Sequence, residues 1–202
     1  MKAWILVILV LAGLPCPAKQ PVKDDIPAIA QILGIRVGKD TMETLEKRLG
    51  PGAVCVGGHP SGGRAWFIKG LNVYVYADGF DYSDDGRLID NLVIAETKED
   101  ARICPPYGQP MPPVPKVNPG KLPLGWLGRV LPGDYKAAVL NATTSLPSPK
   151  LQGHTLYWKA AGEFRDLPIV NLRPGMERTN WYAKLTFKDG KVTVVEVYLY
   201  DH

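Results

Sequence analysis

Two Asp-Gly pairs, Asp85-Gly86 and Asp189-Gly190, constrain the fold more than any other feature of this sequence. Each pair is followed by a run rich in branched residues, LIDNLVIA in one case and VTVVEVYLY in the other. Asp-Gly is a favoured turn between antiparallel strands, so each run is expected to form the second strand of a hairpin. The preceding strands are predicted in NVYVYA and WYAKLTF, which alternate as two-faced strands do. Further strand candidates are GRAWFI and HTLYWKA.

A helix start is predicted ahead of each hairpin. Leu33-Gly34 precedes Asp40 by the same spacing with which Leu127-Gly128 precedes Asp134, 94 residues later. Asp40 and Asp134, or their neighbours Thr41 and Gly133, are suited to cap a helix N-terminus. Helical apolar spacing follows in both places, at Met42, Leu45 and Leu49 and at Tyr135, Ala138 and Val139. The predicted fold class is α+β, with two tandem units, each a short helix packed on a three- or four-stranded antiparallel sheet.

The stretch GIRVGKDTMETLEKRLG superficially matches a phosphate-binding loop. Such a loop places four residues between its glycine and the Gly-Lys pair, and a serine or threonine directly after the lysine. Here three residues separate Gly34 from Gly38-Lys39, and Asp40 occupies the hydroxyl position. The carboxylate would repel a phosphate, so the stretch is interpreted as a helix start.

Residues 1–18 have the features of a signal peptide. Lys2 is followed by an apolar run and then by Pro15-Cys16-Pro17-Ala18. The run is shorter than the ~20 residues that span a bilayer, and no transmembrane segment is expected after cleavage. The sequence thus predicts a secreted or periplasmic protein of the bacterial envelope. Lipid attachment at Cys16 is disfavoured because Pro15 stands where a small residue is needed.

A proline-rich segment at residues 105–123 divides the rest of the chain into a first repeat, 19–104, and a second repeat, 124–202. Dense proline without hydrophobic periodicity is typical of a stiff spacer, the alternative being a ligand for a proline-recognition domain. The second repeat has about ten extra residues, which fall in the loop 161–180. Long loops of this kind are candidates for function.

Cys55 and Cys104 remain after signal cleavage. In an oxidising compartment an even pair favours a disulfide bond. The alternative is two buried free thiols.

Composition excludes some functions. The hydrophobic fraction of 46% is that of a folded globular protein, and the net charge of +4 is too small and dispersed to indicate nucleic-acid binding. His59, His154 and His202 lie far apart in the sequence, without the short spacings of metal ligands. The acidic stretch FDYSDDGRLID, which contains Asp90, lacks the distal glutamate of a calcium loop. We therefore expect no metal, no cofactor and no enzymatic activity.

The strand register predicts a sheet face that the helices leave open. Tyrosines with a few charges are typical of a recognition surface, because tyrosine buries a large area at small entropic cost. The alternative is that tyrosines simply favour strands. The residues expected on this open face are Tyr74, Tyr76, Tyr182, Lys184, Glu196, Tyr198 and Tyr200.

Several features together resemble a known family. They are a glycine before a short capped helix, the helix exit Arg48-Leu49-Gly50, the aromatic strand Ala65-Trp66-Phe67 and a closing Asp-Gly hairpin. This pattern resembles the β-lactamase inhibitor protein fold over most of residues 30 to 200, and the same unit occurs singly in small lipoproteins of the outer-membrane assembly machinery. The resemblance implies tandem units whose sheets join into a concave surface.

The expected function is that of an exported protein-binding module, with an inhibitor-like role as one form of it. Its partner would be another exported or envelope protein, bound through the open aromatic face. The alternative is a small secreted hydrolase that combines His59 or His154 with a neighbouring carboxylate. The lack of a convergent nucleophile, base and metal set in the sequence favours the binding module.

Overall fold

The computed structural model describes residues 26–55, 63–83, 86–103, 110, 113–118, 123–163 and 178–200. Within these ranges the chain is α+β, with a largely antiparallel sheet and two α-helices. The first part of the chain forms η1 (Ala28–Ala30), β1 (Gln31–Ile32), β2 (Ile35–Arg36), α1 (Met42–Leu49), β3 (Ala53–Cys55), β4 (Gly63–Ile68), β5 (Val73–Ser83) and β6 (Gly86–Ala95). The later part forms β7 (Lys116–Val117), α2 (Lys136–Ala142), β8 (Lys150–Gln152), β9 (Thr155–Glu163), β10 (Arg178–Lys188) and β11 (Lys191–Tyr200).

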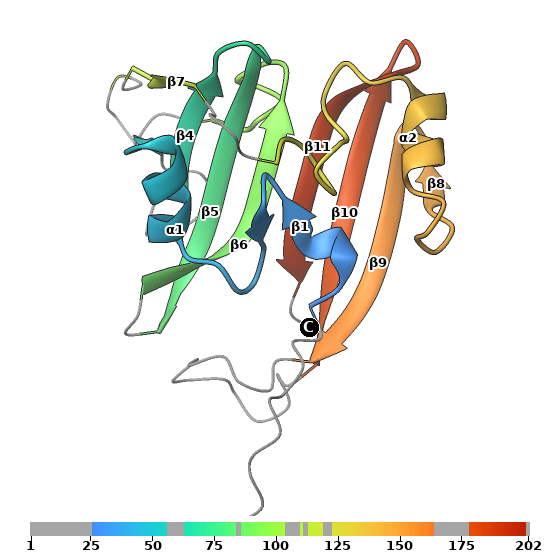
Figure 1. Cartoon of the computed structure of the whole chain (residues 1–202), viewed down its shortest axis with the longest axis horizontal. Helices are drawn as coiled ribbons and strands as arrows, with labels where there is room; N and C mark the ends of the chain where they lie inside the picture. The colour runs from blue at the N-terminus through green and yellow to red at the C-terminus, as the bar shows by residue number, and fades with distance from the viewer. Residues whose placement is uncertain are drawn as a thin grey trace, which may run out of the picture.

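One nine-stranded sheet runs through the molecule, in the order β3-β4-β5-β6-β11-β10-β9-β8, with β7 parallel to β4 at one side (Figure 1). The two halves of the chain meet where β6 pairs antiparallel with β11, from Asn91↔Tyr198 to Ala95↔Val194. A small separate sheet of β1 and β2 lies with η1, α1 and α2 over one face, which we call the helix face (Figure 1). The opposite face is called the far face.

The predicted hairpins are confirmed. β10 and β11 pair up to Lys188↔Lys191, and Asp189 and Gly190 between them have φ angles of 51° and 76°. Two consecutive positive φ angles give the turn whose twist matches that of the strands. β5 and β6 also pair antiparallel, as far as Ser83↔Gly86. The predicted turn residue Asp85 lies outside the described residues.

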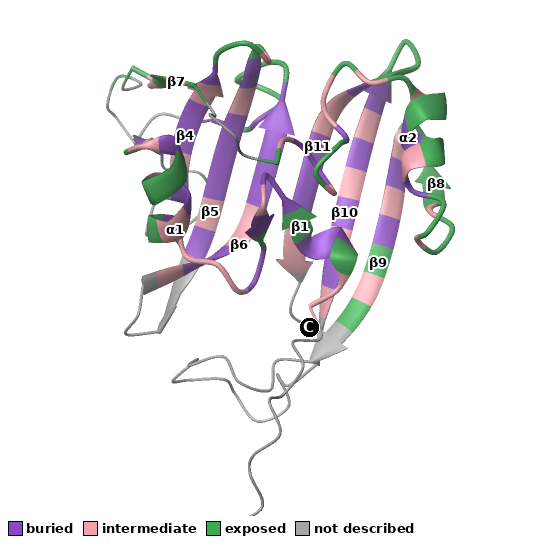
Figure 2. Cartoon of the chain, in the orientation of Figure 1, coloured by how far each residue is buried: buried purple, intermediate pink, exposed green. Residues whose placement is uncertain are grey.

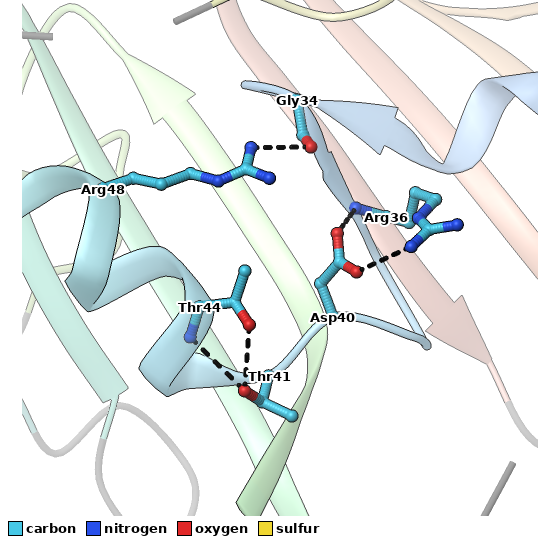
Figure 3. A network of polar contacts seen from close by, with 6 residues as sticks. All are labelled: Gly34, Arg36, Asp40, Thr41, Thr44 and Arg48. Carbon is cyan, nitrogen blue, oxygen red and sulfur yellow. Dashed lines mark hydrogen bonds and ion pairs between the residues drawn. The ribbon is translucent and has the colours of Figure 1, made fainter.

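The first helix begins where expected, and of the two predicted caps, Asp40 and Thr41, the cap is Thr41 (Figure 3). The Thr41 hydroxyl accepts a hydrogen bond from the Thr44 amide at 3.3 Å. The alternative prediction, that Asp40 is the cap, is wrong. Its carboxylate instead accepts hydrogen bonds from the Arg36 amide at 2.8 Å and from the Arg36 guanidinium at 3.2 Å, and so closes the turn ahead of the helix.

The second helix departs further from expectation. Neither Asp134 nor Gly133 caps it, because the N-cap position is Tyr135, which makes no capping bond with its side chain. Asp134 accepts from the Leu131 amide at 2.8 Å, as Asp40 does from Arg36. Of the predicted apolar positions only Val139 is buried, whereas Tyr135 is 62% exposed and Ala138 is also exposed. In α1 all three predicted positions are buried.

The main core lies between the sheet and the elements on the helix face. Burial alternates along β10, so one face of the strand is buried and the other only partly covered (Figure 2). Three tryptophans lie in this core. The Trp126 indole N–H donates to the Ile29 carbonyl, and the Trp181 indole N–H donates to the Val37 carbonyl. The ring centroid of Trp158 lies 4.9 Å from that of Trp126. These contacts join the N-terminal segment to the C-terminal half of the sheet.

A second, smaller core lies on the far face of the first half of the sheet. Residues 96–103 fold back after β6, and Ala101 and Ile103 pack on Tyr76 and Val93. Part of the proline-rich segment adds to this cover, since β7 pairs with β4 and Val114 packs against the cluster. The far face is therefore covered over Ala65, Tyr76 and Val93, and its partly exposed area lies over β9 to β11 and continues to Asn91 of β6 and Asp78 of β5.

Within the described part of the chain, no helix combines the length and apolarity that a bilayer-crossing helix requires.

Candidate binding face of the sheet

Two rows of directly opposed residues cross the far face, because residues opposite each other in antiparallel strands point to the same side. The first row runs from β8 to β5 through Lys150, Tyr157, Lys184, Glu196, Val93 and Tyr76. The second row runs from β9 to β5 through Lys159, Tyr182, Tyr198, Asn91 and Asp78. Lysines therefore mark the β8–β9 end of both rows, and the second row ends in a carboxylate.

Tyr182 and Tyr198 occupy the middle of the second row. Their ring centroids are 5.2 Å apart with planes inclined by 11°, so the two rings stack. The Lys159 ammonium lies 5.6 Å from the centre of the Tyr182 ring, in cation–π range. Both tyrosines are partly exposed. The structure thus brings these two predicted site residues together as one aromatic surface.

Lys184 and Glu196 are opposed in the first row, with Nζ and Oε2 3.2 Å apart. Glu196 is 4% exposed, so the prediction that it lies open on the sheet face is wrong. The cover comes from Arg102, whose guanidinium donates to both carboxylate oxygens, at 2.9 Å and 3.3 Å. Arg102 has a φ of 56°, a backbone conformation that non-glycine residues adopt uncommonly.

The tyrosines of the first half of the sheet differ from expectation. Tyr76 does point to the far face, but it is only 3% exposed under residues 96–103, so it does not belong to an open face. Tyr74 is partly buried, and its ring centre lies 4.9 Å from that of Phe67. The Lys98 ammonium lies 5.9 Å from the centre of the Tyr74 ring. The backbone of Tyr200 pairs with Asn180, and its side chain lies outside the described part.

A pocket of about 350 Å³ opens on the far face, beside the stacked tyrosines at the junction of β6 and β11. Its lining residues come from β5, β6, β10, β11 and the segment 96–103, and are Asp78, Asp90, Asn91, Arg102, Lys184, Glu196, Tyr198 and Leu199. Polar and charged side chains with one aromatic ring are suited to hold a small charged group.

A β-bulge places Asp90 in this pocket. Asp78 pairs with Asn91, but the next residue, Gly79, pairs with Ile89, so Asp90 is an extra residue in β6. Bulges re-aim side chains in this way, and both Asp90 and Asn91 line the pocket. The bulge depends on Gly79, since a Cβ there would overlap with the Leu88 carbonyl oxygen.

Burial and charge both alter the acidity of the pocket groups. The pKa of Asp90 is raised to about 7, mainly by burial and to a smaller extent by the nearby Asp78 carboxylate. Backbone hydrogen bonds and Arg87 act in the opposite direction and lower this pKa. Burial and the neighbouring Glu196 raise the pKa of Tyr198 above its usual value. The Tyr76 hydroxyl donates to Asp78 Oδ2 at 3.0 Å, and burial also raises the Tyr76 pKa. At neutral pH Asp90 thus lies near the midpoint of its titration.

Three pocket residues, Asp78, Arg102 and Asn91, were not predicted from the sequence, and Asp90 was considered only as part of the acidic stretch that lacks the distal glutamate of a calcium loop. The one available signal was Gly79 inside a strand pattern, because an isolated glycine in a strand indicates a bulge. No local pattern marks Arg102, which reaches Glu196 across 94 positions of sequence.

The remaining predicted residues do not join this site. Cys55 is buried in the second core, and its proposed partner Cys104 lies outside the described residues. His154 is exposed in the turn between β8 and β9, while His59 and His202 fall in ranges that the structure leaves undescribed. Among described residues, no group of three or more histidine, cysteine or acidic side chains could hold a metal ion.

Comparison of the chain with known proteins gives no match to a family model, to a curated protein or to a solved structure.

Proposed function

We propose that this chain is an exported protein-binding module that engages another secreted or envelope protein through the far face of its sheet. The observation that carries the proposal is the stacked pair of Tyr182 and Tyr198, partly exposed on the side of the sheet away from the helices. Aromatic anchors of this kind dominate binding energy in protein interfaces. Lys159 over the Tyr182 ring adds a cation at the margin of the surface.

The proposal includes an origin from two tandem units, which matching contacts support. The Leu33 amide donates to the Gly125 carbonyl at 2.9 Å, and the Leu127 amide donates to the Gln31 carbonyl at 3.0 Å, a reciprocal pair between the two loops. Each hairpin has a bulged residue at the equivalent position, Asp90 in β6 and Thr193 in β11, although the β5–β6 hairpin has a second irregularity between Phe80 and Ser83.

The loops before the two helices contact their hairpins in matching ways. The Gly38 amide donates to Ile89 and the Gly133 amide to Val192, each at 2.7 Å. A tandem arrangement around one continuous sheet is the arrangement implied by the resemblance to the β-lactamase inhibitor protein fold. That resemblance, with the partly exposed aromatic surface, supports a binding role that includes enzyme inhibition.

Export through a signal peptide and a Cys55–Cys104 disulfide remain parts of the proposal. The hydrolase alternative needs a histidine beside a carboxylate. His154, the one histidine among the described residues, lies exposed in the β8–β9 turn and does not line the pocket that holds the carboxylates. We therefore keep the binding module as the proposed function.

The test is capture of a partner from the extracellular or periplasmic extract of the source cell by immobilised protein. Four samples are compared: wild type, Tyr182→Ala, Tyr198→Ala and the matched control Tyr135→Ala. Tyr135 is also an exposed tyrosine with a lysine over its ring, the Lys191 ammonium being 5.0 Å away, but it begins α2 on the helix face. We expect both far-face variants to lose at least about thirtyfold in affinity and the control to retain it. Equal capture by all four samples would refute this assignment of the surface.

A photo-crosslinking residue gives a second measurement that does not depend on affinity. It is placed at Lys159 on the far face or at Ala137 on α2, both of which are exposed. Crosslinks to the partner are expected from position 159 only. Crosslinks from position 137 alone would move the interface to the helix face.

A further inference from the structure

We infer that the pocket between β6 and β11 binds a cationic nitrogen group, an ammonium or a guanidinium, and that its occupant in the complex is a lysine or arginine side chain of the protein partner. The identity of the occupant rests on the proposed function. The affinity of the pocket for a cation does not, because it follows from the lining residues alone.

The charge of the lining favours a cation. The pocket has three carboxylates, Asp78, Asp90 and Glu196, and two cations, Arg102 and Lys184. Both cations bind Glu196, at 2.9 Å and 3.2 Å, and so direct their charge to that carboxylate. Asp78 and Asp90 are the other two carboxylates, and Asp78 disfavours ionisation of Asp90. One positive charge placed between them would balance the lining.

The lining also has an excess of hydrogen-bond acceptors. Asp78 Oδ2 accepts from the Tyr76 hydroxyl and Oδ1 from the Gly79 amide, which leaves further lone pairs on each oxygen. The side-chain oxygen of Asn91 is buried without a hydrogen-bond partner. A buried acceptor without a donor is destabilising. Ammonium and guanidinium groups carry only donors, so they fit this lining.

The pocket lies beside the stacked tyrosines. Tyr198 both lines it and stacks on Tyr182, so the pocket is continuous with the aromatic surface of the proposed interface. An aliphatic stem could lie along the Tyr198 ring and Leu199 while its charged end reaches Asp78 and Asp90. Lysine and arginine side chains have this construction.

The charged groups around Asp90 come from several elements. Asp78 and Tyr76 belong to β5, Lys184 to β10, Glu196 to β11 and Arg102 to the segment after β6. Arg87 of β6 also acts on Asp90, but its guanidinium donates to the Gly79 carbonyl at 3.2 Å and it does not line the pocket. A bound cation would favour the ionised form of Asp90, so binding should weaken as the pH falls below the Asp90 pKa.

The experiment titrates the full chain with butylguanidinium chloride and follows backbone amide NMR signals. Butylurea, which has the same shape without the charge, is the control ligand. We expect butylguanidinium to shift the signals of Asn91 and Tyr198 saturably, and butylurea to leave them unchanged. Absence of a saturable shift near pH 8 would overturn the inference, whatever the capture experiment shows.

Variants then assign the binding to the carboxylates. Asp90→Asn and Asp78→Asn should each weaken butylguanidinium binding about tenfold or more, while Glu43→Gln, the same change on the exposed side of α1, should have no effect. If Asp78→Asn does not fold, the isosteric Asp90→Asn decides alone. Lowering the pH from about 8 to about 5.5 should weaken wild-type binding about tenfold or more and leave the residual binding of Asp90→Asn unaffected. Equal binding by wild type and Asp90→Asn would place the cation elsewhere.

Partner capture separates the two sources of the cation. If the occupant is a partner side chain, Asp90→Asn should reduce capture while Glu43→Gln does not. Normal capture by Asp90→Asn, together with lost butylguanidinium binding, would assign the pocket to a free amine and overturn the partner half of the inference. Tyr182→Ala distinguishes failure of the proposed function, because it should abolish capture and leave butylguanidinium binding in place.

Discussion

Arg102 Nη1 lies 2.9 Å from Glu196 Oε1, an ion pair that joins the segment after β6 to the last strand of the sheet. Glu196 is almost fully buried, whereas the Arg102 side chain is 57% exposed. The contact thus covers a carboxylate that would otherwise face solvent. It also fixes one wall of the pocket, because both residues line it.

The first prediction concerns this ion pair. Arg102→Ala should lower the free energy of unfolding by about 1 kcal/mol, because solvent screens the exposed guanidinium and Lys184 still contacts Glu196. A double-mutant cycle with Glu196→Gln, measured by urea unfolding, should give a coupling energy that shrinks in high salt. Additive effects would mean that the pair contributes nothing to stability.

The second prediction concerns the start of α1. Thr41→Ala should lower the free energy of unfolding by about 1 kcal/mol, because the Thr44 amide loses its capping acceptor. Thr41→Ser keeps the hydroxyl and should be close to wild type. Thermal melts of the three proteins provide the comparison. A Ser variant as unstable as the Ala variant would implicate the methyl group rather than the cap.

Local signals in the sequence were sufficient to predict the hairpins and the first helix. The Asp189-Gly190 turn and the buried positions Met42, Leu45 and Leu49 depend on backbone preferences and short-range periodicity, and the structure bears them out. The second helix was less predictable. In α2 only Val139 is buried, because the helix is short and lies at the side of the sheet, so apolar spacing overstated its burial.

Long-range contacts determine what could not be predicted. Alternation in β5 correctly separates Val75 from Tyr76 by face, but it does not reveal that residues 96–103 cover Tyr76. The pairing of β6 with β11, which makes one sheet of the two halves, likewise depends on strands far apart in sequence. The bulge at Asp90 interrupts alternation, so a strict two-residue period misassigns this side chain to a face.

The third prediction concerns the pH dependence of stability. The pKa of Asp90 is raised from 3.8 to about 7, so between these values the folded state binds the proton more tightly than the unfolded chain. Stability contributed by protonated Asp90 is therefore lost as pH rises through this window, and the loss is complete above it. Asp90→Asn should unfold at higher temperature than wild type near pH 8, with a stability gain of up to a few kcal/mol.

Near pH 4 the advantage of Asp90→Asn should disappear, because wild-type Asp90 is then protonated. Butylguanidinium should also narrow the difference near pH 8 by stabilising the ionised wild type. Melting curves for both proteins across this pH range test the prediction. Parallel pH profiles would show that Asp90 titrates near its ordinary value.

The last prediction compares the two faces of β10 and β11. Trp181 and Val197 are fully buried on the helix face, and Trp181 also donates to the Val37 carbonyl at 2.8 Å. Trp181→Ala should therefore cost about 3–5 kcal/mol of stability and Val197→Ala about 2 kcal/mol. Tyr182→Ala and Tyr198→Ala should each cost only about 1 kcal/mol, the contribution of a stacked aromatic pair.

In partner capture, the variants that lose little stability, Tyr182→Ala and Tyr198→Ala, should lose the most binding. The two tyrosine variants should lose binding at temperatures where they remain folded, because their rings form the surface and leave the main core intact. Val197→Ala, measured well below its melting temperature, should bind as wild type does. If Tyr182→Ala and Tyr198→Ala melt as early as Trp181→Ala, the tyrosines support the fold, and the far face loses the residues that make it a candidate interface.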